Sequence, residues 1–119
     1  MSSFLGFPPS ARLTQTREFN RVFRRADIRN RHGALRIAAV ANRMMSARLG
    51  LVVPKRTVRQ AVERNRMKRV LREEFRQRRC TLPALDIVIQ VMARVDNSAL
   101  RADADILFTG LAVNPGDET

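Results

Sequence analysis

The 119-residue sequence lacks tryptophan and tyrosine and has only one histidine and one cysteine. Cys80 alone excludes an internal disulfide and offers no second thiolate for a zinc site, so it is typical of a protein from a reducing compartment, as a buried or incidental thiol. His32 alone excludes a catalytic histidine pair, and its place before a strand predicts a surface residue. No glycine-rich phosphate loop is present.

Acidic residues are also scarce, and none forms a convincing catalytic cluster. Glu73 and Glu74 are adjacent on a predicted helix and point apart, whereas Asp103 and Asp105 lie on the last predicted helix, where we expect a solvated face. The sequence therefore predicts no catalysis by the protein's own side chains and no metal site of its own.

Long apolar runs are missing. The longest, around residues 87–93, is far too short to cross a membrane, and the N-terminus lacks the basic start and apolar core of a signal peptide. We therefore expect a cytoplasmic protein with no membrane partner.

The basic residues are abundant and unevenly placed. The net charge is +12, with 21 arginines and only 2 lysines, and an arginine guanidinium matches phosphate oxygens and stacks on bases. Residues 1–79 hold 21 basic and 5 acidic residues, a net charge of +16, whereas residues 80–119 carry −4. A polyanion is the expected partner, bound through the first two thirds of the chain with a strong dependence on salt.

The hydrophobic pattern predicts one α+β domain spanning residues 1–119, with a flexible arm at 1–13 and a frayed tail at 113–119. Helix and strand signals follow in the order α-β-β-β-α-β-α, which predicts a sandwich of helices packed on a sheet. The expected ranges are a helix capped by Thr14 and ending near residue 25, strands at 28–31, 34–40 and 48–53, a helix at 59–79, a strand at 85–92, and a last helix capped by Asp96 or Asn97.

The helix predicted at residues 59–79 organises the chain. Four apolar residues share one side of it at the spacing of a buried stripe, namely Met67, Val70, Leu71 and Phe75. The opposite arc is almost purely cationic and contains Asn65, Lys68, Arg69, Arg72, Arg76 and Arg79. The acids of this helix are expected outside that arc, so its like charges would repel one another unless they faced a polyanion.

Two segments closely resemble the protein subunit of bacterial ribonuclease P. They are the run Leu49-Gly50-Leu51-Val52-Val53-Pro54-Lys55-Arg56 and the run Ala61-Val62-Glu63-Arg64-Asn65-Arg66-Met67-Lys68-Arg69-Val70-Leu71-Arg72-Glu73-Glu74-Phe75-Arg76. The Arg-Asn-Arg-x-Lys-Arg core followed by Arg-Glu-x-Phe-Arg is that family's specific signature. The resemblance extends over about residues 12–112.

The resemblance implies a two-layer α-β-β-β-α-β-α sandwich with a left-handed β-α-β crossover, a hand that periodicity does not predict. It also implies that a large catalytic RNA subunit hydrolyses precursor tRNA with Mg²⁺, which the RNA mainly binds. The protein would hold that RNA and the 5′ leader of the precursor. The expected RNA-binding residues are Lys55, Arg56, Arg59, Arg64, Asn65, Arg66, Lys68, Arg69 and Arg72. Phe19 and Phe23 match positions at the edge of the leader cleft.

Three departures from the family pattern qualify these expectations. Pro54 precedes the basic pair where the family usually has Ser or Ala, and Gly33-Ala34-Leu35 supplies no aromatic to the leader cleft. The last helix carries Asp103 and Asp105 where the family often has basic residues, so we expect no RNA contact from its exposed face. Phe19 and Phe23 have i, i+4 spacing, which also favours ordinary core packing.

Three other functions are compatible with a basic domain. A structural RNA-binding protein of ribosomal type would bind ribosomal RNA without stimulating tRNA processing. A protein-only nuclease would cleave RNA by itself, which the shortage of catalytic groups disfavours. A DNA-binding helix would prefer duplex DNA, but no helix-turn-helix pair precedes the basic helix, so we do not expect DNA as a partner.

Overall fold

The computed structural model describes residues 12, 13, 15–44 and 46–112, and the α-β-β-β-α-β-α order is confirmed there. One turn of 3₁₀ helix, η3, follows the second helix. The elements are α1 (Thr16–Arg25), β1 (Ile28–His32), β2 (Leu35–Ala41), β3 (Arg48–Val52), α2 (Ala61–Arg78), η3 (Arg79–Thr81), β4 (Leu85–Val91) and α3 (Asn97–Ala112).

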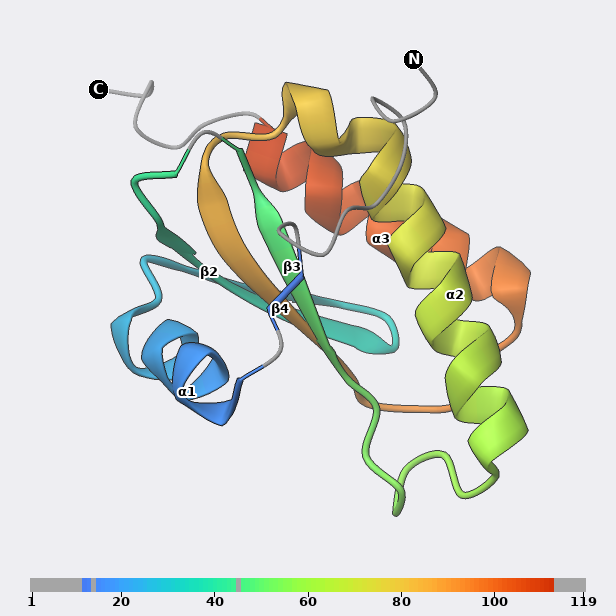
Figure 1. Cartoon of the computed structure of the whole chain (residues 1–119). Coiled ribbons are helices and arrows are strands. Elements are labelled where there is room, and N and C mark those ends of the chain that lie inside the picture. The colour runs from blue at the N-terminus through green and yellow to red at the C-terminus, as the bar shows by residue number, and fades with distance from the viewer. Residues whose placement is uncertain (1–11, 14, 45, 113–119) are drawn as a thin grey trace.

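The four strands form one sheet in the order β1-β2-β4-β3 (Figure 1). β2 pairs antiparallel with β1 and with β4, whereas β3 runs parallel to β4. Because β3 and β4 are parallel neighbours, the chain must return across the sheet between them, and α2 makes this return. The crossover is left-handed, as the resemblance implied, and so departs from the usual right-handed rule.

Helices lie against both faces of the sheet. α2 and α3 cover one face, where Leu35, Ile37 and Ile87 join the main hydrophobic core. α1 lies on the opposite face, where Val22 packs with β2 and β4 in a smaller core. The alternation of side chains along β2 explains this division, since successive residues of a strand point to opposite faces.

The buried stripe predicted for α2 is confirmed. Met67, Leu71 and Phe75 are fully buried and Val70 nearly so, and the Phe75 ring lies 6.0 Å from that of Phe108 between centroids. The predicted phase of the helix is therefore right. α2 begins at Ala61 after the N-cap residue Gln60, so Arg59 lies in the preceding loop rather than in the helix.

The start of α1 differs from the prediction. The N-cap is Gln15, whose backbone N–H donates to Glu18 Oε1 at 3.3 Å, while Thr14 lies outside the described residues. Residues 1–11 of the expected arm and the expected tail at 113–119 also lie outside them. Leu13, however, is only 4% exposed and donates its N–H to the Leu49 carbonyl at 2.9 Å, which fixes it beside β3.

The interpretation of Asp103 as part of a solvated face is wrong. Its carboxylate accepts the Ala34 N–H at 3.0 Å in the turn between β1 and β2, and His32 Nε2 lies 3.7 Å away. Gly33 has a φ of +56°, and a Cβ there would collide with the Asp103 carboxylate. α3 therefore holds the β1–β2 hairpin through a carboxylate that only a glycine turn can approach.

The rest of α3 follows the prediction. Asp96 Oδ1 accepts the Ala99 N–H at 2.9 Å, and Leu100, Ala104, Leu107 and Leu111 are buried. None of the helices in the described part of the chain is long and apolar enough to cross a membrane.

Candidate nucleic-acid interface

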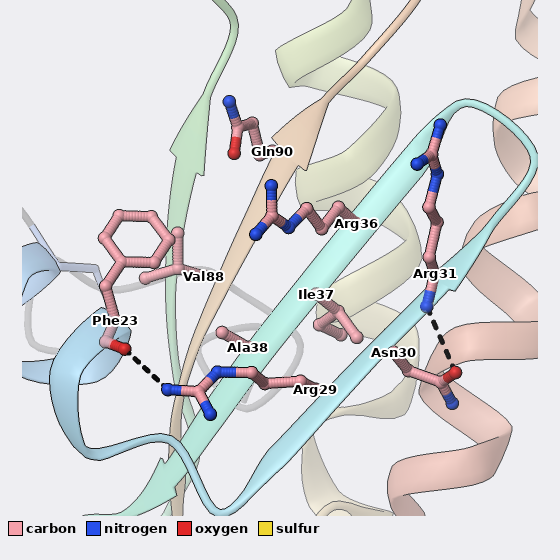
Figure 2. Close-up of a pocket in the computed structure, with 9 residues that line it drawn as sticks. All are labelled: Phe23, Arg29, Asn30, Arg31, Arg36, Ile37, Ala38, Val88 and Gln90. Carbon is pink, nitrogen blue, oxygen red and sulfur yellow. Dashed lines mark hydrogen bonds between the residues drawn. The ribbon is translucent and has the colours of Figure 1, made fainter.

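A wide cleft lies between the end of α1 and the sheet face beside it (Figure 2). Its volume is about 820 Å³, and we call it the sheet cleft. The residues that line it are Phe23, Arg29, Asn30, Arg31, Arg36, Ile37, Ala38, Val88 and Gln90. α1 packs over Ala38, Val40 and Val88 and leaves the adjoining part of this sheet face uncovered.

The two phenylalanines expected at the leader cleft have different positions. Phe23 is 40% exposed and lines the sheet cleft, where its ring stands on the α1 side in Figure 2. Phe19 is half-buried in the smaller core and does not line the cleft. A Cβ at Gly50 would come within 2.7 Å of the Phe19 ring, so Gly50 provides the room for that ring.

Three arginines give the sheet cleft its charge. Arg29 and Arg31 of β1 lie opposite Ala38 and Arg36 of β2, so all point to the α1 face. Arg29 Nη2 also donates to the Phe23 carbonyl at 2.9 Å, which ties β1 to the last turn of α1. As the sequence predicts, the sheet residues that line the cleft include no aromatic side chain, so Phe23 of α1 is the aromatic residue among its lining residues.

Gln90 is the cleft residue with the broadest hydrogen-bonding capacity. It lies directly across from Arg36, and its amide can both donate and accept. The cleft thus combines guanidinium donors, one aromatic face and one amide, which suits a single RNA strand.

A second basic hollow lies along α2. We call it the α2 depression, and its volume is about 460 Å³. It is lined by Arg12, Asn65, Arg69, Arg72, Glu73 and Arg76. The structure therefore brings together three of the predicted RNA-binding residues, Asn65, Arg69 and Arg72. Burial, followed by the positive charge of Arg12, holds the pKa of Arg72 below its ordinary value.

Arg64 and Arg66, which are also predicted to bind RNA, donate hydrogen bonds to other groups of the protein. Arg64 Nη1 donates to the Val58 carbonyl at 3.0 Å and to the Arg59 carbonyl at 2.8 Å. Arg66 donates to Glu63 Oε1, to Asn97 Oδ1 and to the Val95 carbonyl at 2.5–3.1 Å. Arg64 therefore holds the loop before α2, and Arg66 holds the start of α3 and the residues before it.

Arg64 holds the loop between β3 and α2, and this loop carries three more of the cations that are predicted to bind RNA. Lys55, Arg56 and Arg59 are exposed between β3 and α2, and Arg56 and Arg59 line a hollow of about 430 Å³ together with Arg94. Lys68 is half-buried on α2. The prediction that Lys55 and Arg56 lie beside the start of the helix is confirmed for Arg56, which lines this hollow together with Gln60 and Glu63.

The arc of α2 that is predicted to be cationic also contains an acidic residue. Arg76 forms a close ion pair with Glu73, which lines the α2 depression itself, and the hydrogen bond from Arg76 holds the pKa of Glu73 below its ordinary value. Arg79 lies in η3 and donates to Ser46 Oγ at 2.8 Å. The expectation that the acids lie outside the arc is wrong for Glu73, because a glutamate three residues before an arginine reaches it on the helix surface.

Sequence reasoning missed one buried charge cluster. Asp86 is fully buried and accepts hydrogen bonds from Arg48 and Asn42 at 2.8–2.9 Å and from Arg21 at 3.1 Å. These partners come from α1, from β3 and from the end of β2. The alternation of β4 alone does not reveal them, since Asp86 interrupts a run of apolar residues without a local partner.

Residues 12–13, 15–44 and 46–112 include no group of three His, Cys, Asp or Glu side chains that could hold a metal ion. His32 is exposed at the end of β1, as predicted, and Cys80 is exposed in η3 rather than buried.

Comparisons with known proteins agree with this geometry. Residues 7–111 match the Ribonuclease P family model. The chain is 39% identical to the ribonuclease P protein component of Halorhodospira halophila over 98% of both chains, and 42% identical to that of Salmonella arizonae over 81% of this chain and 82% of the other. The solved ribonuclease P protein of Thermotoga maritima superposes with a TM-score of 0.73 at 28% identity, over 83% of this chain and 96% of the other. The chain therefore belongs to the ribonuclease P protein family.

Proposed function

We propose that this chain is the protein component of a bacterial ribonuclease P and supports maturation of tRNA 5′ ends. The observation that carries the proposal is the pair of separate basic hollows, the α2 depression and the sheet cleft, which share no lining residue. Two hollows suit two RNA segments. Family membership supplies the identity of the ribonucleoprotein.

In this proposal the catalytic RNA subunit lies against the α2 side. Asn65, Lys68, Arg69 and Arg72 on α2 and Lys55, Arg56 and Arg59 in the preceding loop would contact its phosphates. Arg64 and Arg66 would act through the backbone and side chains they hold. Each phosphate neutralised releases about 0.9 counterion from a duplex, so binding should weaken steeply with salt.

The 5′ leader of precursor tRNA would occupy the sheet cleft. Phe23 offers a face for one unpaired base, and Arg29, Arg31 and Arg36 offer donors to the backbone around it. The protein would bind the leader on one side and the catalytic RNA on another, and its basic residues would lie between the two RNAs. The protein thereby lowers the repulsion between two polyanions, which raises substrate affinity.

We assign Mg²⁺ and the hydrolytic step to the RNA. Mg²⁺ prefers oxygen ligands and commonly binds with phosphates, which the RNA supplies in the ribonucleoprotein. The proposed partners are therefore the catalytic RNA and precursor tRNA, with neither duplex DNA nor a membrane, and the proposed place of action is the cytoplasm.

Reconstitution tests this function. The protein is added to a bacterial ribonuclease P RNA at low Mg²⁺, and cleavage of a precursor tRNA is followed with and without it. We expect faster cleavage and tighter binding of the precursor, with little effect on binding of mature tRNA. Arg101→Gln, an exposed residue of α3 outside both hollows, is the matched control and should behave like the unchanged protein.

Two results would contradict the proposal. Absence of stimulation together with tight binding to ribosomal RNA would indicate the structural RNA-binding alternative. Cleavage of RNA by the purified protein alone would indicate a protein nuclease.

A further inference from the structure

Arg12 lies in the α2 depression, although it is far from α2 in the sequence. The segment at residues 12 and 13 runs beside β3 at the sheet edge, where Arg12 forms a parallel bridge with Leu49 (Figure 1). Leu13 is buried in the smaller core and donates to the Leu49 carbonyl. The backbone that carries Arg12 is therefore fixed by packing and by a hydrogen bond.

The side chain of Arg12 lines the α2 depression beside Asn65, Arg69 and Arg72. Arg12 and Arg72 lie close enough for the charge of one to disfavour the charge of the other. Two like charges held together by the fold cost free energy in the protein alone. Glu73, the acid of this hollow, is bound by Arg76 and Gln77. An anion between Arg12 and Arg72 would offset their repulsion.

We propose that Arg12 and Arg72 together form a phosphate-binding site for one phosphodiester of the catalytic RNA. This inference rests on the proposed function and adds to it a binding residue from outside α2. Guanidinium groups present paired N–H donors that match phosphate oxygens, and Asn65 and Arg69 supply further donors in the same hollow. Two chain segments more than fifty residues apart thus converge on one phosphate.

The occupant is the catalytic RNA rather than the leader because of where the site lies. The α2 depression and the sheet cleft share no lining residue, and the sheet lies between α1 and α2. A leader strand in the cleft would reach Phe23 and Arg36 and would not need Arg12.

The test uses the full chain with Arg12→Gln, Arg72→Gln and the double variant, and Arg101→Gln as the control. Binding to ribonuclease P RNA alone is titrated across KCl concentrations, and thermal unfolding is measured without RNA. Each single variant should weaken binding by roughly tenfold, the loss of one charge-assisted hydrogen-bond set. Each should also lower the salt slope by about one. The double variant should lose much less than the product of the two, because both residues bind one phosphate.

Thermal unfolding separates this site from a structural role. Burial and the charge of Arg12 both disfavour the charge of Arg72. Arg72→Gln should therefore leave the unfolding temperature unchanged or raised, while RNA affinity falls. A lowered unfolding temperature that accounts for the weaker binding would overturn the inference.

Other outcomes also decide the matter. Unchanged affinity of Arg12→Gln, in a preparation whose unchanged protein stimulates cleavage, would overturn this site and leave the proposed function standing. Strictly multiplicative losses would place the two residues on different phosphates and would also overturn it. If Arg12→Gln weakened binding only to a single-stranded leader oligonucleotide, Arg12 would contact the leader and not the catalytic RNA. That result would also overturn the inference. Failure of the unchanged protein to bind the RNA would remove the proposed function itself.

Discussion

Arg48 and Asp86 form a two-point ion pair across the parallel strands β3 and β4, with Nε to Oδ1 and Nη2 to Oδ2 both at 2.8 Å. The two residues are in direct register. Arg21 of α1 reaches the same carboxylate, so this pair joins the edge strand, the central strand and the helix that walls the sheet cleft.

The pair predicts acid sensitivity. Burial opposes ionisation of Asp86, but the hydrogen bonds from Arg48 and Asn42 outweigh it, and the pKa of Asp86 is lowered. A lowered folded-state pKa gives stability that is present above the unfolded value of about 3.9 and is lost as pH falls through the folded value. The free energy of unfolding, measured by urea denaturation, should therefore fall below about pH 4.

Asp86→Asn should remove the pH-dependent stability that the Asp86 carboxylate contributes. It should destabilise the fold at pH 7 by about 3–5 kcal/mol, because it leaves Arg48 without its buried partner. Asp105→Asn is the control, since Asp105 pairs with Arg78 at an exposed position and its loss should cost less than about 1 kcal/mol. Equal stability losses in the two variants would show that the buried pair has no special role.

The two arginines Arg66 and Arg69 should respond in opposite ways to substitution. Arg69→Gln removes an exposed guanidinium from the α2 depression, so it should lower the salt slope of RNA binding by about one while unfolding changes by less than about 0.5 kcal/mol. Arg66→Gln breaks hydrogen bonds to Asn97 and Val95 and should destabilise by about 1–3 kcal/mol with an unchanged slope. RNA titrations in KCl and urea denaturation check both, and a reduced slope for Arg66→Gln would show a direct phosphate contact.

Phe23 should contribute to leader binding and not to binding of the tRNA body. Phe23→Leu keeps an apolar side chain but loses the aromatic face, so the holoenzyme should bind precursor tRNA about 1–3 kcal/mol more weakly, the range for one stacked base. Mature tRNA should bind as before. Ile106→Ala, an exposed apolar residue of α3, is the control. Equal losses for precursor and mature tRNA would contradict a leader contact.

Phe75 anchors α2 to the core. Phe75→Ala should lower the free energy of unfolding by about 3–5 kcal/mol, as large core truncations do. Val62→Ala on the same helix is the control, since Val62 is 68% exposed and its change should be small. Chemical denaturation measures both, and a loss near zero for Phe75→Ala would be incompatible with its burial against Phe108.

Local patterns were sufficient for most of the fold. The stripe from Met67 to Phe75 and the repeat from Leu100 to Leu111 place two helices correctly because burial follows the period of the helix. The hand of the crossover does not follow from any local pattern, and it came only through the family resemblance.

The candidate site was only partly predictable, because a long side chain has many possible partners within reach. Arg66 and Arg69 look equivalent in sequence, yet one is held by the chain before α3 and the other is exposed. Arg36 and Gln90 join the sheet cleft only because β2 and β4 are neighbours. The burial of Asp86 likewise depends on pairing that the sequence does not state.

The place of β4 in the sheet has a consequence for synthesis. β4 is the last strand to leave the ribosome, yet it lies between β2 and β3 and is the neighbour through which they join. Until residue 91 has been translated, the nascent chain can form the β1–β2 hairpin but cannot attach β3 to it. The arginine-rich α2 is made before that moment, so the nascent protein displays its cations before it has the scaffold that arranges them. Completion of the sheet by a late, non-local strand should accordingly be the slow step of folding.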